Sequence, residues 1–114
     1  MFDLASIKEA KNKSQEKRGN TAEEIYQEAF KTLKNFSINH NIELLREAGE
    51  NLAKVIEFNK KHFDSYICLA YIFHILDNDQ FALKYLREAQ EIKPDLPYNI
   101  ELFKEELELK LDLI

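Results

Sequence analysis

Residues 66–94, YICLAYIFHILDNDQFALKYLREAQEIKP, decide the fold of this chain. Apolar residues recur every three or four positions on both sides of the polar turn Asp77-Asn78-Asp79, which is the spacing of two amphipathic helices. Ala70 and Ala82 are small enough for the two helices to cross closely. Pro94 ends the second helix because proline cannot continue it. The stretch therefore predicts an antiparallel helical hairpin.

The same helical spacing continues outward from this hairpin. Two glycines and two prolines in 114 residues are too few for the turns of a many-stranded sandwich or barrel. The alternating tail at 107–113 reads as a strand by its period, but its Leu, Glu and Lys residues favour helix. The sequence predicts an all-α fold with helices over about 21–36, 42–56, 63–76, 81–92 and 98–114.

Two local features refine this prediction. Thr21 and Glu24 have the spacing of a capping box, so we expect the first helix to begin at Thr21 and the polar residues 37–41 to end it. Gly49 lies inside the second predicted helix, where glycine costs about 1 kcal/mol relative to alanine. A close helix crossing at Gly49 would explain its presence.

The hairpin resembles the tetratricopeptide repeat (TPR). It fills the signature positions of that family without a gap, with Tyr in place of Trp, Ala in place of Gly and Leu in place of an aromatic residue. The resemblance implies helix pairs stacked into a short α-α superhelix, although a generic five-helix bundle is an alternative. The matching pattern is Tyr66-x2-Leu69-Ala70-x2-Phe73-x8-Ala82-x3-Leu86-x2-Ala89-x4-Pro94.

The resemblance divides the chain into four parts. Residues 1–20, with five basic and three acidic side chains, are expected to form a flexible or weakly helical basic arm. Residues 21–60 form a degenerate repeat, in which the second helix keeps the 34-residue register and the first does not. Residues 61–95 form the well-matched repeat, and residues 97–114 form a capping helix of the kind that closes such solenoids.

Patterns that carry catalysis are missing from the sequence. None of the three histidines has a second ligand at the spacing of a zinc site. Asp77-x-Asp79 lacks the glycine and the distal glutamate of a calcium loop. Cys68 lies in an apolar helix without a base nearby, as a small core residue would. We therefore expect no enzyme activity, no metal and no cofactor.

Charge and composition also narrow the class of partner. The net charge of −5 disfavours nucleic acid, which requires a positive face. No apolar run is long enough to cross a bilayer, and no segment resembles the apolar core of a signal peptide. The single cysteine fits a reducing compartment. These features predict a cytoplasmic protein that neither binds nucleic acid nor inserts into membranes.

The family resemblance also implies a binding groove for a protein or peptide partner, as in an adaptor, an assembly factor or a chaperone-like protein. The first helix of each pair would line this groove, with an exposed apolar patch edged by lysines. Such a patch suits a partner peptide or helix that has apolar anchors and an acidic flank. The alternative is that the last helix or the N-terminal arm folds back over the patch. Carried over by position, the groove residues are Gln27, Lys31, Lys34, Asn35, Asp64, Ile67, Tyr71, His74 and Ile75.

The last predicted helix carries two apolar stripes, although a capping helix needs only one. Exposed leucines are unfavourable in water, so the second stripe predicts a contact. The alternative function is therefore a self-associating structural protein that forms a homodimer through this helix, unless the N-terminal arm covers the stripe. The second stripe consists of Leu102, Leu109 and Leu113.

Overall fold

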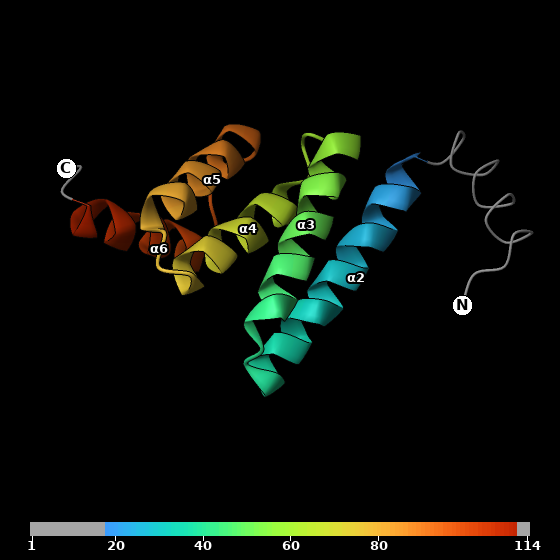
Figure 1. The fold of residues 1–114 in the computed structure, drawn as a ribbon. Helices are drawn as coiled ribbons and strands as arrows, with labels where there is room; N and C mark the ends of the chain where they lie inside the picture. Colours follow the sequence, from blue (N-terminus) through green and yellow to red (C-terminus); the bar gives the residue numbers. More distant parts are fainter. Residues whose placement is uncertain (1–17, 112–114) are drawn as a thin grey trace, which may run out of the picture.

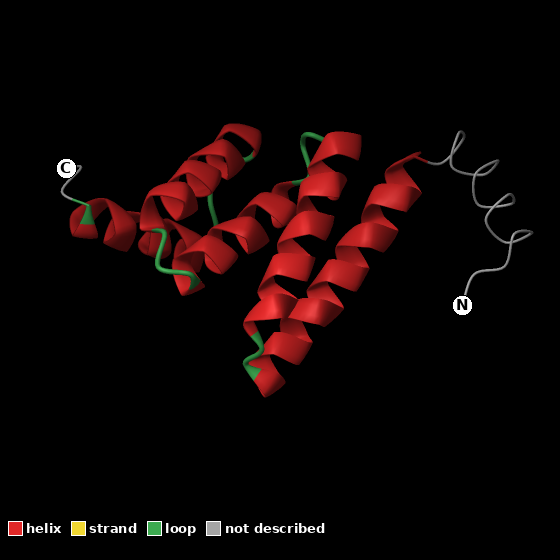
Figure 2. Cartoon of the chain, viewed as in Figure 1, coloured by secondary structure: helices red, strands yellow, loops and turns green. Residues whose placement is uncertain are grey.

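The computed structural model describes residues 18–111, and this part of the chain is all-α, with no strand. The prediction of an all-α fold is confirmed, as Figure 2 shows. The predicted arm lies outside the described residues up to residue 17, and so does Leu113. The helices are α2 (Arg18–Asn39), α3 (Ile42–Phe58), α4 (Phe63–Ile75), α5 (Asp79–Ile92) and α6 (Tyr98–Lys110).

The helices form two antiparallel pairs followed by a single helix (Figure 1). The most extensive packing lies within the pairs α2–α3 and α4–α5. The pairs meet where α3 packs against α4, and α6 packs against α5. In Figure 1, α6 lies on the side of the α4–α5 pair that faces away from α3.

Short polar segments separate the helices. His40 and Asp77 both adopt the left-handed conformation, with φ of 57° and 61°, and each reverses the chain between two paired helices. The Asn41 side chain then accepts a hydrogen bond from the Glu43 amide at the start of α3, and Asn78 caps α5 in the same way. These caps satisfy backbone amides that have no partner inside the helix.

Two local predictions are wrong. Helix α2 already runs from Arg18 through Thr21, so Thr21 does not precede the helix as an N-cap, and the helix also continues to Asn39. The break predicted at 37–41 is confined to His40 and Asn41. Gly49 does not mark a close crossing, because a Cβ built there would meet no atom of a neighbouring element within 4 Å.

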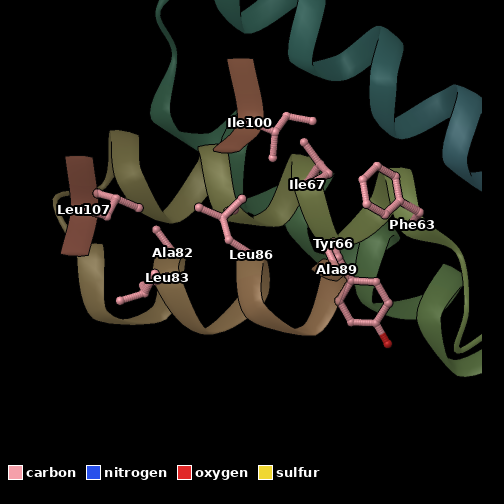
Figure 3. Close-up of a cluster of buried hydrophobic side chains, with 10 residues drawn as sticks. Phe63, Tyr66, Ile67, Ala82, Leu83, Leu86, Ala89, Ile100 and Leu107 are labelled. Atoms are coloured by element: carbon pink, nitrogen blue, oxygen red, sulfur yellow. The ribbon is translucent and has the colours of Figure 1, made fainter. Parts of the chain in front are cut away.

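The core has two parts that share α4. One part joins α4, α5 and α6, where Leu86 is fully buried between helices and Ile100 and Leu107 from α6 complete the cluster (Figure 3). The other part joins α2, α3 and α4. Ala70 and Ala82 are both fully buried, as expected for small residues at a close crossing. Helix α4 is therefore the central element of the fold.

Candidate functional site

Helix α4 is covered on most of its circumference, and three of its four exposed residues form one strip, with the fourth, His74, beside it. This α4 strip consists of Asp64, Tyr71 and Ile75. Tyr71 and Ile75 follow Asp64 by seven and eleven residues, close to two and three full turns, so the three residues lie along one line of the helix. The Tyr71 ring stacks on Phe103 of α6 with centroids 4.7 Å apart and an interplanar angle of 6°, yet Tyr71 remains 39% exposed. The strip thus presents an aromatic side chain whose orientation is fixed by packing.

The exposure predicted for Ile67 is wrong. Ile67 is only 8% exposed and belongs to the same core cluster as Ile100. Helix α6 covers this side of α4, as Figure 3 shows for the two isoleucines. The neighbouring His74 stays exposed, with its ring edge against Phe103 at 5.1 Å. The predicted apolar patch is therefore reduced to Tyr71 and Ile75.

The predicted groove residues of α2 lie on a different surface. Gln27, Lys31, Lys34 and Asn35 are all exposed. The first three line a shallow hollow of about 710 Å³ formed by α2 alone, together with Phe30 and three glutamates. No residue of α4 lines this hollow. The structure therefore does not bring the two lysines and the α4 strip into one pocket.

A chain of aromatic contacts nevertheless connects the two surfaces. The Lys34 ammonium lies over the Phe30 ring at 4.9 Å, and Phe30 stacks on Tyr26 at 6.1 Å. The Tyr26 hydroxyl lies 3.9 Å from the Cys68 sulfur, and Cys68 stands four residues after Asp64 on α4. Lys34 thus borders the surface that leads to the α4 strip, and it pairs with no carboxylate among residues 18–111.

His62 has a structural role where α2 meets α4. Its Nδ1 accepts a hydrogen bond from the Ser65 amide, so its Nε2 carries the proton and donates to Glu23 at 3.0 Å. This hydrogen bond lowers the pKa of the Glu23 carboxyl, with a further contribution from Gln27.

Burial raises the pKa of the Cys68 thiol. A protonated, half-buried thiol is a poor nucleophile.

Asp79 connects the last three helices. Its buried carboxylate lies 2.8 Å from Nδ1 of His74 on α4 and 2.5 Å from the Lys110 ammonium on α6. The Lys110 hydrogen bond and then the His74 hydrogen bond lower the pKa of Asp79. Among residues 18–111 no group of three or more His, Cys, Asp or Glu side chains could hold a metal ion. Through its contacts with His74 and Lys110, Asp79 links the start of α5 to α4 and α6.

A second candidate surface, the α3–α5 groove, has no counterpart in the sequence predictions. It has a volume of about 740 Å³, and α4 forms its floor through Leu69, Ile72 and Phe73. Gly49 and Ala53 lie on its α3 wall one helical turn apart, and their lack of bulk leaves the groove open. That pair of small residues on one helix face is the sequence signal that could have indicated the groove.

The groove is apolar inside and carries charge at its edges. Tyr85 of α5 stacks on Phe73 with ring centroids 5.5 Å apart, which fixes one wall. The Lys84 ammonium lies 5.5 Å from the centre of the Tyr85 ring. On the α3 edge, Arg46 is held between Glu43 and Glu50. Such a surface suits an apolar side-chain row flanked by charge.

The second stripe of α6 faces away from the core. Leu102 and Leu109 are exposed, Leu109 at 64%, and Tyr98 at the start of the helix is 78% exposed. Glu105 is exposed between them. We refer to Tyr98, Leu102, Glu105 and Leu109 as the α6 strip.

Comparisons with known proteins give no relative, so the proposals below rest on the fold and on these surfaces. The chain matches no family model, and no curated protein or solved structure is significantly similar to it. Within residues 18–111, no helix is both long enough and apolar enough to traverse a bilayer. The features on which a function can rest are therefore exposed apolar strips on an all-helical scaffold of antiparallel pairs.

Proposed function

We propose that this chain is a non-catalytic protein–protein interaction module of the TPR-like kind, which binds a partner peptide or helix on the α4 strip. The observation that carries the proposal is the state of Tyr71, which is exposed but fixed against Phe103. Aromatic residues dominate binding energy at protein interfaces. A side chain that is already ordered loses less conformational entropy when a partner binds.

The surface also defines the chemistry of the partner. Tyr71 and Ile75 offer contacts to apolar side chains, and the surface continues through Tyr26 and Phe30 to the ammonium of Lys34. The partner is thus a segment with apolar anchors and an acidic flank, bound by an adaptor, assembly factor or chaperone-like protein. The unpaired Cys68 supports a cytoplasmic location, where thiols remain reduced.

The test is affinity purification from the native cell, followed by direct binding of the recovered partner to purified variants. Tyr71→Ala and Ile75→Ala remove the anchors, and Tyr71→Phe keeps the stacked ring. Phe58→Ala is the matched control, because Phe58 is an exposed aromatic residue at the end of α3. We expect Tyr71→Ala to weaken binding by about tenfold or more, which corresponds to about 1.4 kcal/mol.

The controls decide how this result is interpreted. Thermal unfolding must show that each variant folds, since Tyr71→Ala also removes a ring contact. Tyr71→Phe and Phe58→Ala should bind the partner as the wild type does. A partner that binds Tyr71→Ala and Ile75→Ala as tightly as the wild type would refute the proposed surface.

Self-association is the second candidate function, and the exposure of Leu102 and Leu109 on α6 favours it. Exposed leucines on one helix face are typical of contacts between chains. Sedimentation of the wild type and of a variant with both leucines changed to lysine tests this function. If the wild type and the variant were both monomeric at every concentration, self-association would be excluded.

A further inference from the structure

We infer that the α6 strip of one copy of this chain docks in the α3–α5 groove of a second copy. The inference rests on self-association as the second candidate function and names the two surfaces that would meet. Because the two surfaces are different, the contact is heterologous: each copy offers one strip and one groove. Two copies can then exchange strips reciprocally, or further copies can add in a row.

The two surfaces match in length. From Tyr98 to Leu109 the strip spans about 17 Å, at 1.5 Å per helical residue. The α3 wall of the groove, from Ile42 to Ile56, spans about 21 Å by the same rule. The groove can therefore hold the whole apolar row of the strip, as in other complexes where a helix lies in a groove.

The two surfaces also match in chemistry. The groove has an apolar floor and an exposed apolar end at Ile42 and Leu76, which suits the two leucines of the strip. Glu105 in the middle of the strip pairs with no cation among residues 18–111, and Lys84 at the groove edge pairs with no carboxylate there. Docking in the register that places Glu105 beside Lys84, and not beside Glu88 one turn further along the same edge, brings these opposite charges together.

A strip-to-strip contact is the simpler alternative. Helix α6 carries Glu101, Glu105, Glu106 and Glu108 against Lys104 and Lys110, and α3 is acidic by the same margin. Net charge therefore does not separate the two contacts, and the mixing of variants described below does. A copy cannot fill its own groove, because α6 packs on the far side of the α4–α5 pair from α3 and its strip faces outward (Figure 1).

Two variants separate the surfaces. Gly49→Trp fills the groove, because the space in front of Gly49 is open, and Gly49→Ala is its matched control with a side chain too small to block docking. Leu102→Lys combined with Leu109→Lys disables the strip. The mass of each purified chain is measured by sedimentation over a range of concentrations, after circular dichroism has confirmed that each variant is helical.

We expect the wild type and Gly49→Ala to self-associate as concentration rises. Gly49→Trp and the double lysine variant should each associate at least about tenfold more weakly. Mixing these two variants should restore a complex of one copy of each, because one retains an intact strip and the other an intact groove. A strip-to-strip dimer cannot give this rescue.

Each contrary result has a distinct meaning. A wild type that stays monomeric refutes both self-association and the docking of the strip in the groove. A Gly49→Trp variant that self-associates like the wild type refutes the groove as the docking surface and leaves self-association standing. The mixed complex holds one strip-in-groove contact, so a mixture that associates no more strongly than either variant alone refutes the heterologous contact.

Discussion

Replacing Gly49 by alanine should stabilise the fold, and the sign of this effect tests the reasoning about the groove. Gly49 lies in the middle of α3 with a helical backbone that any residue can adopt. Alanine is favoured over glycine inside a helix by about 1 kcal/mol. The new Cβ would meet no atom of a neighbouring element within 4 Å, so no clash offsets this gain. We expect the free energy of unfolding to rise by about 0.5–1 kcal/mol.

The measurement is urea unfolding followed by circular dichroism at 222 nm, with thermal unfolding as a second readout. For a domain of this size, 1 kcal/mol corresponds to a shift in Tm of about 4–8 °C. The samples should be dilute enough that the chain is monomeric, so that a change in association does not contribute.

Ala53→Gly is the matched control, because Ala53 lies one turn further along the same exposed wall of α3. It should lower the free energy of unfolding by about the amount that Gly49→Ala raises it, since both changes act through the helix backbone. The variant carrying both changes should be close to the wild type. A loss of stability in Gly49→Ala would mean that α3 is closely packed at Gly49, and the open groove would then be wrong.

Three further predictions concern the core, the cysteine and the Asp79 link. Leu86→Ala should lower the free energy of unfolding by about 3–4 kcal/mol in urea titration, because Leu86 is fully buried. Cys68 should react with a thiol reagent more slowly than a free cysteine at pH 8 and at the normal rate in urea, because burial raises its pKa. Asp79→Asn should destabilise the fold at pH 7, whereas the matched charge change Asp77→Asn in the exposed turn should have little effect. Lys110 lowers the pKa of Asp79, so the contribution of the Asp79 carboxylate to the free energy of unfolding is complete above about pH 4 and disappears as the pH falls through the lowered pKa. The unfolding curves of Asp79→Asn and the wild type should therefore converge in acid.

The sequence predicted the helices well because their apolar stripes are local and regular. The starts of α3 and α4, and the polar turn before α5, follow from the spacing of the apolar residues, and the structure adds caps at Asn41 and Asn78. The prediction failed at Thr21, where a capping preference of about 1 kcal/mol competed with continuation of the helix toward Arg18. The ends of helices depend on such small differences, whereas their existence does not.

The exposure of α4 could not be predicted by the same method. An apolar stripe reveals the buried face of a helix only when the other faces are polar. Helix α4 is apolar on most of its circumference, so its sequence does not indicate which residues α6 covers. Ile67 was therefore expected to be exposed, although α6 buries it. The position of α6, which follows α4 and α5 in the chain, decides which part of α4 remains accessible.

The two proposed contacts use different sides of α4, and this makes them separable. Tyr71 belongs to the α4 strip and Phe73 to the floor of the α3–α5 groove, and at 100° per residue they point about 160° apart. A partner on the strip and a second copy in the groove therefore do not compete for the same side chains. Tyr71→Ala should leave self-association unchanged, and Gly49→Trp should leave partner binding unchanged. If either substitution altered both properties, α4 would have to transmit the change through its rigidly packed core, or one surface would have to serve both contacts.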